Sequence, residues 1–340
     1  MVTTRERIVW IDYIKIFACF LVAVGHFLQS MISAEIVMMS SVYSWLLTTI
    51  YYFHVQLFFI CSGYLYWQGC SEKRTKMIVV GKIRKLLTQV IPYVVFSLIT
   101  WCLKALFSGS VNTPNEGLAE TLLLHPVNQY WYVYTLFFLF LLVPGVRKQG
   151  TAVAVLVVSA VLKILAVMGM EPHFFAGASL MQNGIWFAFG IGIAHWQLDQ
   201  KVFGKQWGAV GIVLVALFLL LSFLPLSGAL FSTVMGLIGC CAFLIVAINI
   251  PNDSSKVTEN LSQCTIYIFL LHTICAAGCR AVLLKLGIDH WVIHYIVGVL
   301  ASFVAPCFAA WLMKKTKTDF LAEPGKYLKF KNKSDSMIVQ

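Results

Sequence analysis

The chain reads IDYIKIFACFLVAVGHFLQSM over residues 11–31, an apolar run long enough to cross a membrane as one helix. Lys15 and His26 lie inside it, eleven residues apart. At 1.5 Å per residue this predicts a separation of roughly 16 Å along the helix axis, with both side chains on one face. Asp12 and Cys19 fall on that face too. Because charges inside a membrane are costly, this polar stripe indicates a functional site.

Composition assigns the whole chain to the membrane. Of its 340 residues, 60% are hydrophobic and 11% are charged, whereas soluble domains carry about 25% charged residues. The N-terminus does not read as a cleaved signal peptide, because Asp12 and Lys15 interrupt the apolar run. The ten cysteines lie mostly inside apolar stretches without zinc-ligand spacing, so we expect packing residues and no metal site.

Apolar runs of helical length recur along the chain. Helices are the expected form, because lipid cannot satisfy the backbone polar groups of an open strand. We predict an all-α, polytopic membrane domain over residues 1–315 and a basic cytoplasmic tail over 316–340, partly disordered. About ten transmembrane helices are predicted, at residues 11–31, 45–67, 86–107, 129–146, 151–169, 178–197, 207–225, 228–249, 262–284 and 291–313.

The basic residues predict the orientation of these helices. With the N-terminus inside, 20 of the 25 lysines and arginines fall on cytoplasmic segments. This asymmetry predicts that both termini are cytoplasmic. It also explains the net charge of +11 as charge that faces anionic lipid, so no nucleic-acid binding is implied.

Two further spans carry histidines. The second contains YYFHVQLFFICSGY over residues 51–64, with His54 near its outer end. Neighbouring antiparallel helices would hold His26 and His54 at similar depth, so we expect the two imidazoles to meet. His272 lies mid-membrane in the ninth span. A lone membrane histidine is more often structural, but three of them beside a buried lysine and aspartate favour a shared functional cavity.

Small and aromatic residues complete the pattern. Ser62 and Gly63 permit close approach of a neighbouring helix. The fourth span opens with Gln129-Tyr130-Trp131-Tyr132, which is typical either of an aromatic belt at the membrane surface or of a surface that binds an acceptor.

In this order, the residues resemble the membrane-bound acyltransferase-3 family of bacteria, which includes O-acetyltransferases and succinyltransferases of cell-envelope polysaccharides. The likeness spans about residues 8–275. Lys15 stands where the family more often has arginine, and the basic segment lies farther from the following proline than usual. The likeness rests on DYIK…GH at 12–26, FHxxLFFxxSGY at 53–64, basic residues at 82–85 before Pro92-Tyr93, Trp131-Tyr132, and YxxxLH at 267–272.

The resemblance implies transfer of an acetyl or succinyl group from cytoplasmic acyl-CoA to a hydroxyl of a glycan or lipid-linked acceptor on the outer side of the membrane. Acetyl-CoA is the donor expected first. A neutral imidazole suits proton transfer or covalent catalysis, and cations on the inner face suit the phosphates of CoA. The expected catalytic residues are His26 and His54. For acyl-CoA we expect Lys15, Lys82, Arg84 and Lys85, and for support or the acceptor side Asp12, Ser62, Trp131, Tyr132 and His272.

Several alternatives stay open. A transporter of lipid-linked or polymeric glycan, or a scaffold for a biosynthetic complex, would also use many spans with buried polar groups. Lys15 could instead form a structural ion pair with Asp12, one turn away. We expect a multi-pass protein of the bacterial plasma membrane, with membrane lipid and envelope-biosynthesis proteins as partners and no permanently bound cofactor.

We expect residues 72–85 to face the cytoplasm, because six lysines and arginines lie there. A single cysteine introduced in this segment should react with a membrane-impermeant maleimide only after the membrane is opened. A cysteine at residue 116, on the longest outer segment, should react in intact cells. Labelling of the 72–85 segment in intact cells would show the orientation to be reversed.

Overall fold

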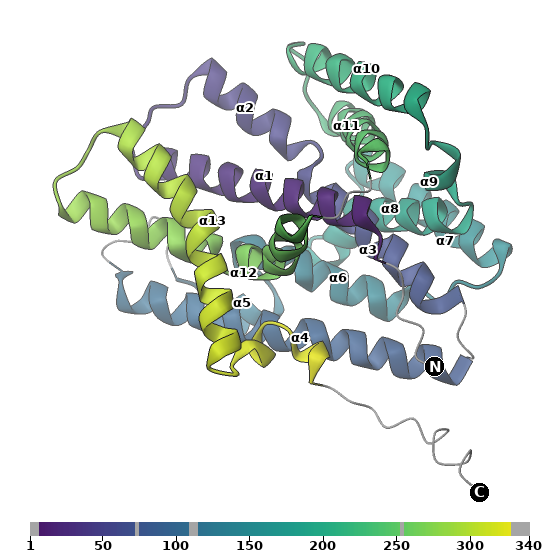
Figure 1. Cartoon of the computed structure of the whole chain (residues 1–340), viewed down its shortest axis with the longest axis horizontal. Coiled ribbons are helices and arrows are strands. Elements are labelled where there is room, and N and C mark those ends of the chain that lie inside the picture. Colours follow the sequence, from purple (N-terminus) through teal and green to yellow (C-terminus); the bar gives the residue numbers. More distant parts are fainter. Residues whose placement is uncertain (1–6, 72–74, 109–114, 252–254, 328–340) are drawn as a thin grey trace, which may run out of the picture.

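The computed structural model describes residues 7–71, 75–108, 115–251 and 255–327, and these ranges contain helices and no strand (Figure 1). This confirms the all-α prediction. Residues 328–340 of the expected tail lie outside the described residues. The helices are α1 (Val9–Ser33), α2 (Ser41–Tyr51), α3 (His54–Ser71), α4 (Thr75–Leu106), α5 (Leu118–Leu123), η2 (Asn128–Tyr130), α6 (Trp131–Leu142), α7 (Gln149–Val167), α8 (Phe175–His195), α9 (Leu198–Lys201), α10 (Lys205–Ser222), α11 (Ala229–Asn249), α12 (Lys256–Lys285), α13 (Trp291–Lys315), η3 (Asp319–Leu321) and η4 (Pro324–Lys326).

Every predicted span contains a helix, and eight helical segments of the described chain are long and apolar enough to cross a membrane. Two predicted spans are not among the eight. The helix α8 has 21 residues, but Gln182 and Asn183 lower its mean hydropathy. The helix α6 has only 12 residues. The count of ten crossings therefore stays a prediction, whereas the multi-pass membrane architecture is confirmed.

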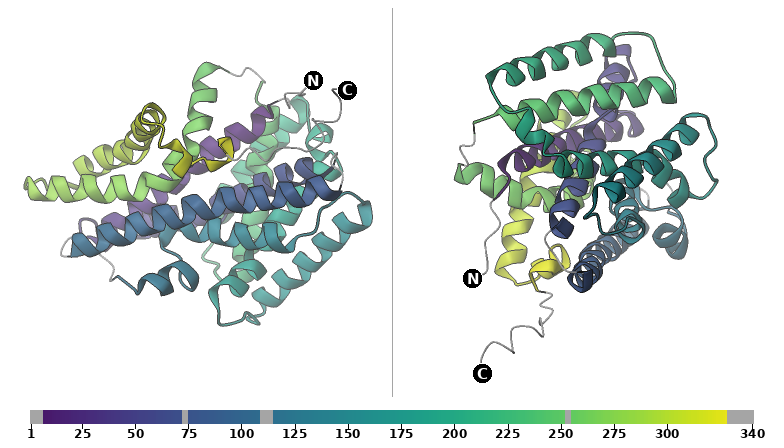
Figure 2. Two further views of the ribbon diagram at one scale, coloured as in Figure 1. Left: turned by 90° about the horizontal axis from the view of Figure 1, so that it is seen from below. Right: turned by 90° about the vertical axis from the view of Figure 1, so that its right-hand side faces the viewer.

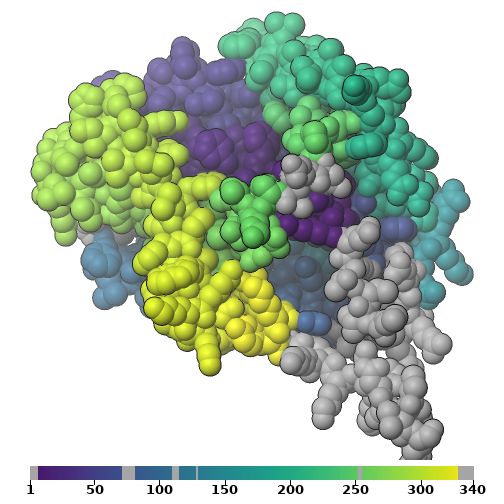
Figure 3. Space-filling view, in the orientation of Figure 1, coloured from purple at the N-terminus to yellow at the C-terminus, as the bar shows by residue number. Residues whose placement is uncertain are grey.

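The first helix, α1, lies at the centre of the bundle. It contacts α2, α3, α11, α12 and α13, and in the space-filling view it is visible only between its neighbours (Figures 1 and 3). Polar residues of α1 therefore meet protein rather than lipid. This arrangement follows from its sequence, because a polar stripe on a membrane helix is stabilised only when other helices cover it.

The outermost helices have the composition expected of a lipid-facing surface. The helices α10 and α11 form a pair at one edge of the bundle (Figure 2), and α7 packs against α8. Val157 and Val158 of α7 are 54% and 58% exposed, and Ile212 and Val213 of α10 are exposed to a similar extent. In water so many exposed aliphatic side chains would be costly, but lipid tails solvate them.

The helix ends that the sequence analysis predicts to be cytoplasmic come together at one end of the bundle. Arg7, before α1, forms an ion pair with Glu259 in the first turn of α12. Tyr64 of α3 donates a 2.7 Å hydrogen bond to Asp199 of α9. Arg84 of α4 donates to the carbonyl of Gly325, which ties the last described segment to the same end. These contacts agree with the predicted placement of the helix ends concerned, while the orientation of the bundle in the membrane stays a prediction.

The helices α3 and α8 pack with their backbones in contact. A Cβ atom added at Gly63 would lie 1.9 Å from the carbonyl oxygen of Phe187, and one added at Gly190 would lie 2.0 Å from the carbonyl oxygen of Ile60. The two glycines therefore face each other's helix across one contact. This confirms the expectation that small residues at 62–63 allow a close helix approach, and α8 is the helix concerned.

We expect Gly63→Ala to destabilise the protein by about 1–3 kcal/mol or more, because the added methyl group would force two backbones apart. Gly69→Ala, on the same helix, is the matched control, since a Cβ there meets nothing within 4 Å. Thermal unfolding of the purified variants in detergent measures the difference. Equal midpoints for the two variants would contradict the close packing of α3 on α8.

Candidate active site

Three histidines from three helices meet inside the bundle. The ring centroids of His26 on α1 and His272 on α12 are 5.2 Å apart. Tyr51, at the end of α2, lies between His26 and His54. Its ring centroid is 6.4 Å from that of His26 and 4.8 Å from that of His54. His54 and His272 are buried, and His26 is half-buried. The structure thus brings together the three residues, called here the histidine cluster, while the role of each stays a prediction.

A break in the second span positions His54. Residues 52 and 53 form a turn between α2 and α3, so His54 is the first residue of α3, where an uninterrupted helix over 45–67 was expected. In a continuous helix the carbonyl of Ile50 would accept from the backbone of residue 54. Here that carbonyl lies 2.8 Å from Nδ1 of the His54 ring. The imidazole thus satisfies a carbonyl group at a depth where water is scarce.

The hydrogen bonds of two histidines decide which ring nitrogen carries the proton. A carbonyl oxygen only accepts, so Nδ1 of His54 is the donor to Ile50. By the same argument Nδ1 of His272 donates to the carbonyls of Ile268 and Phe269, at 2.8 and 3.0 Å. In the neutral rings Nε2 is then left as an acceptor, and Nε2 of His272 is buried without a partner in the described structure. Both rings therefore offer a basic nitrogen inside the bundle.

The polar face of α1 packs against α12, a neighbour that the sequence analysis did not identify. Asp12 accepts a hydrogen bond from Ser262 at the inner end, Cys19 donates to the carbonyl of Thr265, and His26 lies beside His272. These contacts confirm that Asp12, Cys19 and His26 share one face. The partners on α12 follow the same order as the residues on α1, so the two helices run parallel and form one polar seam.

The carboxylate of Asp12 pairs with Arg7, and within the described residues it forms no ion pair with Lys15. The alternative of a structural Lys15–Asp12 pair is therefore wrong. Lys15 is half-buried and lies within electrostatic range of Cys19, Cys61 and Lys85. Two cations held near each other favour a bound anion between them.

The basic residues of α4 divide into two groups. Lys85 lies 5.4 Å from the ring centroid of Phe140, and Lys82 lies 6.0 Å from that of Tyr66 and donates to the carbonyl of Val143. Both contact the same aromatic pair, since the rings of Tyr66 and Phe140 are 5.3 Å apart. Arg84 instead donates to the carbonyl of Gly325. The structure thus brings Lys15, Lys82 and Lys85 to one end of the bundle and directs Arg84 toward the C-terminal segment.

Tyr132 and Ser62 lie between these lysines and the histidine cluster. Their hydroxyl groups are 2.9 Å apart, and Tyr132 also donates to the carbonyl of Phe58. Ser62 is two turns of α3 beyond His54, toward the inner end. Trp131 of α6 packs on Phe59 of α3. Trp131 and Tyr132 are therefore inside the bundle, whereas a position at the outer surface was expected.

The reason is that the chain enters the bundle before α6 begins. The hydroxyls of Tyr93 and Tyr134 donate to the carbonyls of Leu122 and Leu123, at the end of the short helix α5. Tyr93 stands in the middle of α4, so the end of α5 packs beside the middle of that helix, and the chain becomes fully buried at Gln129 and Tyr130. This explains why α6 needs only 12 residues to reach the inner end.

The same entry segment brings in Gln129 and Tyr130, which the sequence analysis noted at the start of the fourth span but did not assign to the site. Gln129 is buried, and its side-chain nitrogen donates a 2.7 Å hydrogen bond to Thr273, the neighbour of His272. Its Oε1 has no partner among the described residues. Tyr130 donates to the carbonyl of Leu270 at 2.8 Å. Periodicity could not reveal these contacts, because Gln129 lies ahead of the helix, and Tyr51 was hidden among other aromatic residues.

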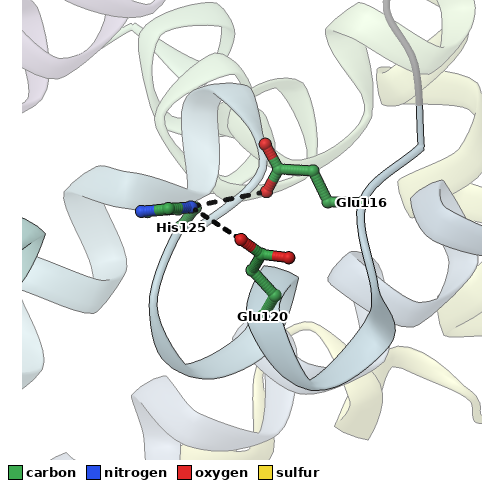
Figure 4. A group of neighbouring side chains, drawn as sticks. All are labelled: Glu116, Glu120 and His125. Carbon is green, nitrogen blue, oxygen red and sulfur yellow. Dashed lines mark ion pairs between the residues drawn. The ribbon is translucent and has the colours of Figure 1, made fainter.

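One group of side chains could in principle hold a metal ion. Glu116, Glu120 and His125 converge around α5 (Figure 4), with ligand atoms that lie within 4.8 Å of one another. Nδ1 of His125 is 3.6 Å from Glu116 and 3.5 Å from Glu120. All three side chains are exposed, whereas His54 and His272 are buried. Such groups commonly form on surfaces without a metal, so these residues do not add metal chemistry to the site.

The comparisons with known proteins give one family. The model of the acyltransferase-3 family, described as an acyltransferase domain, matches residues 8–312. Among curated proteins and among solved structures, no match reaches significance.

Proposed function

The chain belongs to the acyltransferase-3 family and is a membrane acyltransferase, and from this premise we propose that it transfers an acetyl or succinyl group from cytoplasmic acyl-CoA to a hydroxyl of a cell-envelope glycan or lipid-linked acceptor. The reaction would take place in the bacterial plasma membrane, with the acceptor on the outer side. One observation carries the proposal. Lysines gather at one end of the bundle, and the hydrogen-bonded pair Ser62–Tyr132 lies inside it, two turns of α3 from His54.

This arrangement suits a donor that enters from the inner end. Lys15 and Lys85 would bind the phosphates of CoA, with Lys82 beside them, because ammonium groups form charge-assisted hydrogen bonds to phosphate. The arm of CoA would extend past Ser62 and Tyr132. Its thioester would then lie at the histidine cluster, on the side of the membrane where the acceptor arrives.

In the direct route, His26 takes the proton of the acceptor hydroxyl as its oxygen attacks the thioester carbonyl. The new C–O bond forms, the C–S bond breaks, and the thiolate of CoA leaves with the proton from the imidazolium. In the covalent route, the imidazole nitrogen attacks the thioester carbonyl, the C–S bond breaks, and CoA leaves with the ring proton. The acceptor oxygen then forms the C–O bond as the C–N bond breaks, and its proton returns to the imidazole. His54 and His272 would orient His26 or share its proton. Mixing the protein with labelled donor alone, followed by rapid desalting at neutral pH, distinguishes the routes, because only the covalent route leaves label on the protein.

We expect His26→Ala to lower acyl transfer by roughly 10²–10⁴-fold, the usual loss when a general base is removed. Turnover is measured as label transferred from radioactive acetyl-CoA or succinyl-CoA, together with release of CoA. His290→Ala is the control, because His290 is exposed at the start of α13. A His26→Ala variant that keeps more than about a tenth of wild-type turnover excludes this role. If the His54→Ala variant is inactive and the His26→Ala variant is active, His54 is the catalytic base and His26 has the supporting role. Glycan transport without acyl turnover would instead favour the transporter.

We expect Lys15→Ala to weaken CoA binding by about tenfold or more, since a hydrogen bond between charged groups contributes about 1.5–3 kcal/mol. The protein should stay folded, because Asp12 keeps its partners Arg7 and Ser262. Titration of the protein in lipid nanodiscs with CoA measures the affinity. Lys285→Ala, exposed at the opposite end of the bundle, is the control. Unchanged affinity in Lys15→Ala removes Lys15 from the donor site.

A further inference from the structure

A cavity of about 570 Å³ opens at the end of the bundle opposite to Lys15 and Lys85. It is bordered by the end of α1 at Gln29, the start of α2 at Ser44 and the start of α11 at Ser232. The C-terminal end of α7 and the first half of α8 close the other side. All these helix ends are the ones predicted to face outward. The volume falls within the range of about 300–1,000 Å³ that is typical of small-molecule sites.

The cavity shares one wall with the histidine cluster. Tyr51 lines the cavity, and its ring also contacts His26 and His54. The hydroxyl of Tyr51 donates a 2.8 Å hydrogen bond to Oε1 of Gln29, a second lining residue that stands three positions after His26 on α1. A swing of the Tyr51 side chain would therefore join the cavity to the cluster.

The lining is rich in groups that form hydrogen bonds. Amide side chains come from Gln29, Gln56 and Gln182, and hydroxyl groups come from both tyrosines and from serine and threonine residues of α2 and α11. Oε1 of Gln56 is buried without a partner in the described part of the chain. A buried polar atom without a partner costs free energy, and a turn of the Gln56 amide toward a ligand hydroxyl in the cavity would recover it. Trp186 and Tyr52 add aromatic faces for the apolar side of a ring.

The charges of the lining cancel. Lys163 is its single cation and Glu171 its single anion, and the two lie within electrostatic range of each other. Gln182 donates a 2.6 Å hydrogen bond to Glu171. A phosphate or carboxylate would gain little here. The opposite end of the bundle, with Lys15 and Lys85, has the reverse character.

We propose that this cavity binds the acceptor, and that it takes an uncharged sugar unit whose hydroxyl groups bind Gln56 and its neighbours while one hydroxyl reaches the cluster past Tyr51. This rests on the proposed function, and it adds the location of the acceptor and its chemical class. Gln56, Tyr51 and Ser232 become residues of the acceptor site. Trp131 and Tyr132, by contrast, are left on the path of the donor.

Two variants test the cavity in different ways. Gln56→Leu removes hydrogen bonds at constant size and should raise the KM for the sugar about tenfold, with the KM for acyl-CoA unchanged. Ser232→Trp fills the cavity from an exposed position in the first turns of α11, so the fold should tolerate it, and it should reduce transfer to sugar at least tenfold. Gln149→Leu, exposed at the inner end of α7, is the matched control.

The assay uses protein in lipid nanodiscs, because alkyl glycoside detergents would themselves enter a sugar site. The donors are radiolabelled acetyl-CoA and succinyl-CoA, and the probes are methyl glucoside and methyl galactoside, with methyl glucuronide as the charged comparison. Slow release of CoA to water, measured without sugar, reports the donor reaction by itself and should be equal in all variants.

The outcomes separate the two proposals. If neither acetyl-CoA nor succinyl-CoA releases CoA, with or without a methyl glycoside, the proposed function is overturned. Transfer to a methyl glycoside that both Gln56→Leu and Ser232→Trp leave unchanged overturns the cavity as the acceptor site, while the function stands. Preference for methyl glucuronide overturns the uncharged class. Loss of sugar transfer in Ser232→Trp, with CoA release retained, supports the proposal even where Gln56→Leu does not fold.

Discussion

The arrangement of the whole bundle depends on the cost of exposing polar groups to lipid. One face of α1 carries Asp12, Lys15 and His26, and hydrocarbon cannot solvate any of them. Protein must therefore cover that face, and α12 does so along its length, from Ser262 to His272. Once α1 is surrounded, its neighbours carry the other polar residues to the same interior. The site is thus a consequence of how a costly helix is shielded, and His54 and His272 on its neighbours are almost completely buried.

Backbone contact between α3 and α8 has a comparable effect on the second polar helix. Gly63 and Gly190 let these helices approach until carbonyl oxygens fill the space that side chains would take. The helix α3 is thereby fixed close to Tyr132, and the hydroxyls of Ser62 and Tyr132 can meet. The two ends of the interior differ in charge, with lysines at one end and neutral amides and hydroxyls at the other. Such a difference suits a reaction whose two substrates come from opposite sides.

The sequence alone predicted which segments are helical, which face of α1 is polar and which three histidines meet, because these follow from periodicity and from the cost of polar groups in lipid. It did not predict the turn at residues 52–53, since no glycine or proline marks it. It also placed Trp131 too far out, because apolar length measures how much chain can cross a membrane and not where that chain starts. The partnership of α1 with α12 joins residues about 250 positions apart, as Asp12 and Ser262 show, and local patterns carry no such information.

The break before His54 has an electrostatic consequence. Each peptide group carries a dipole, and at a helix start these add up to a partial positive charge of about half an elementary unit. In a continuous span this charge would lie at the membrane surface, where water screens it. Because α3 begins at His54, its positive end is instead held within the bundle. The helix α2 ends at Tyr51, directly before this start, and its end carries the opposite partial charge, so the break places both signs of the helix dipole at the level of the cluster.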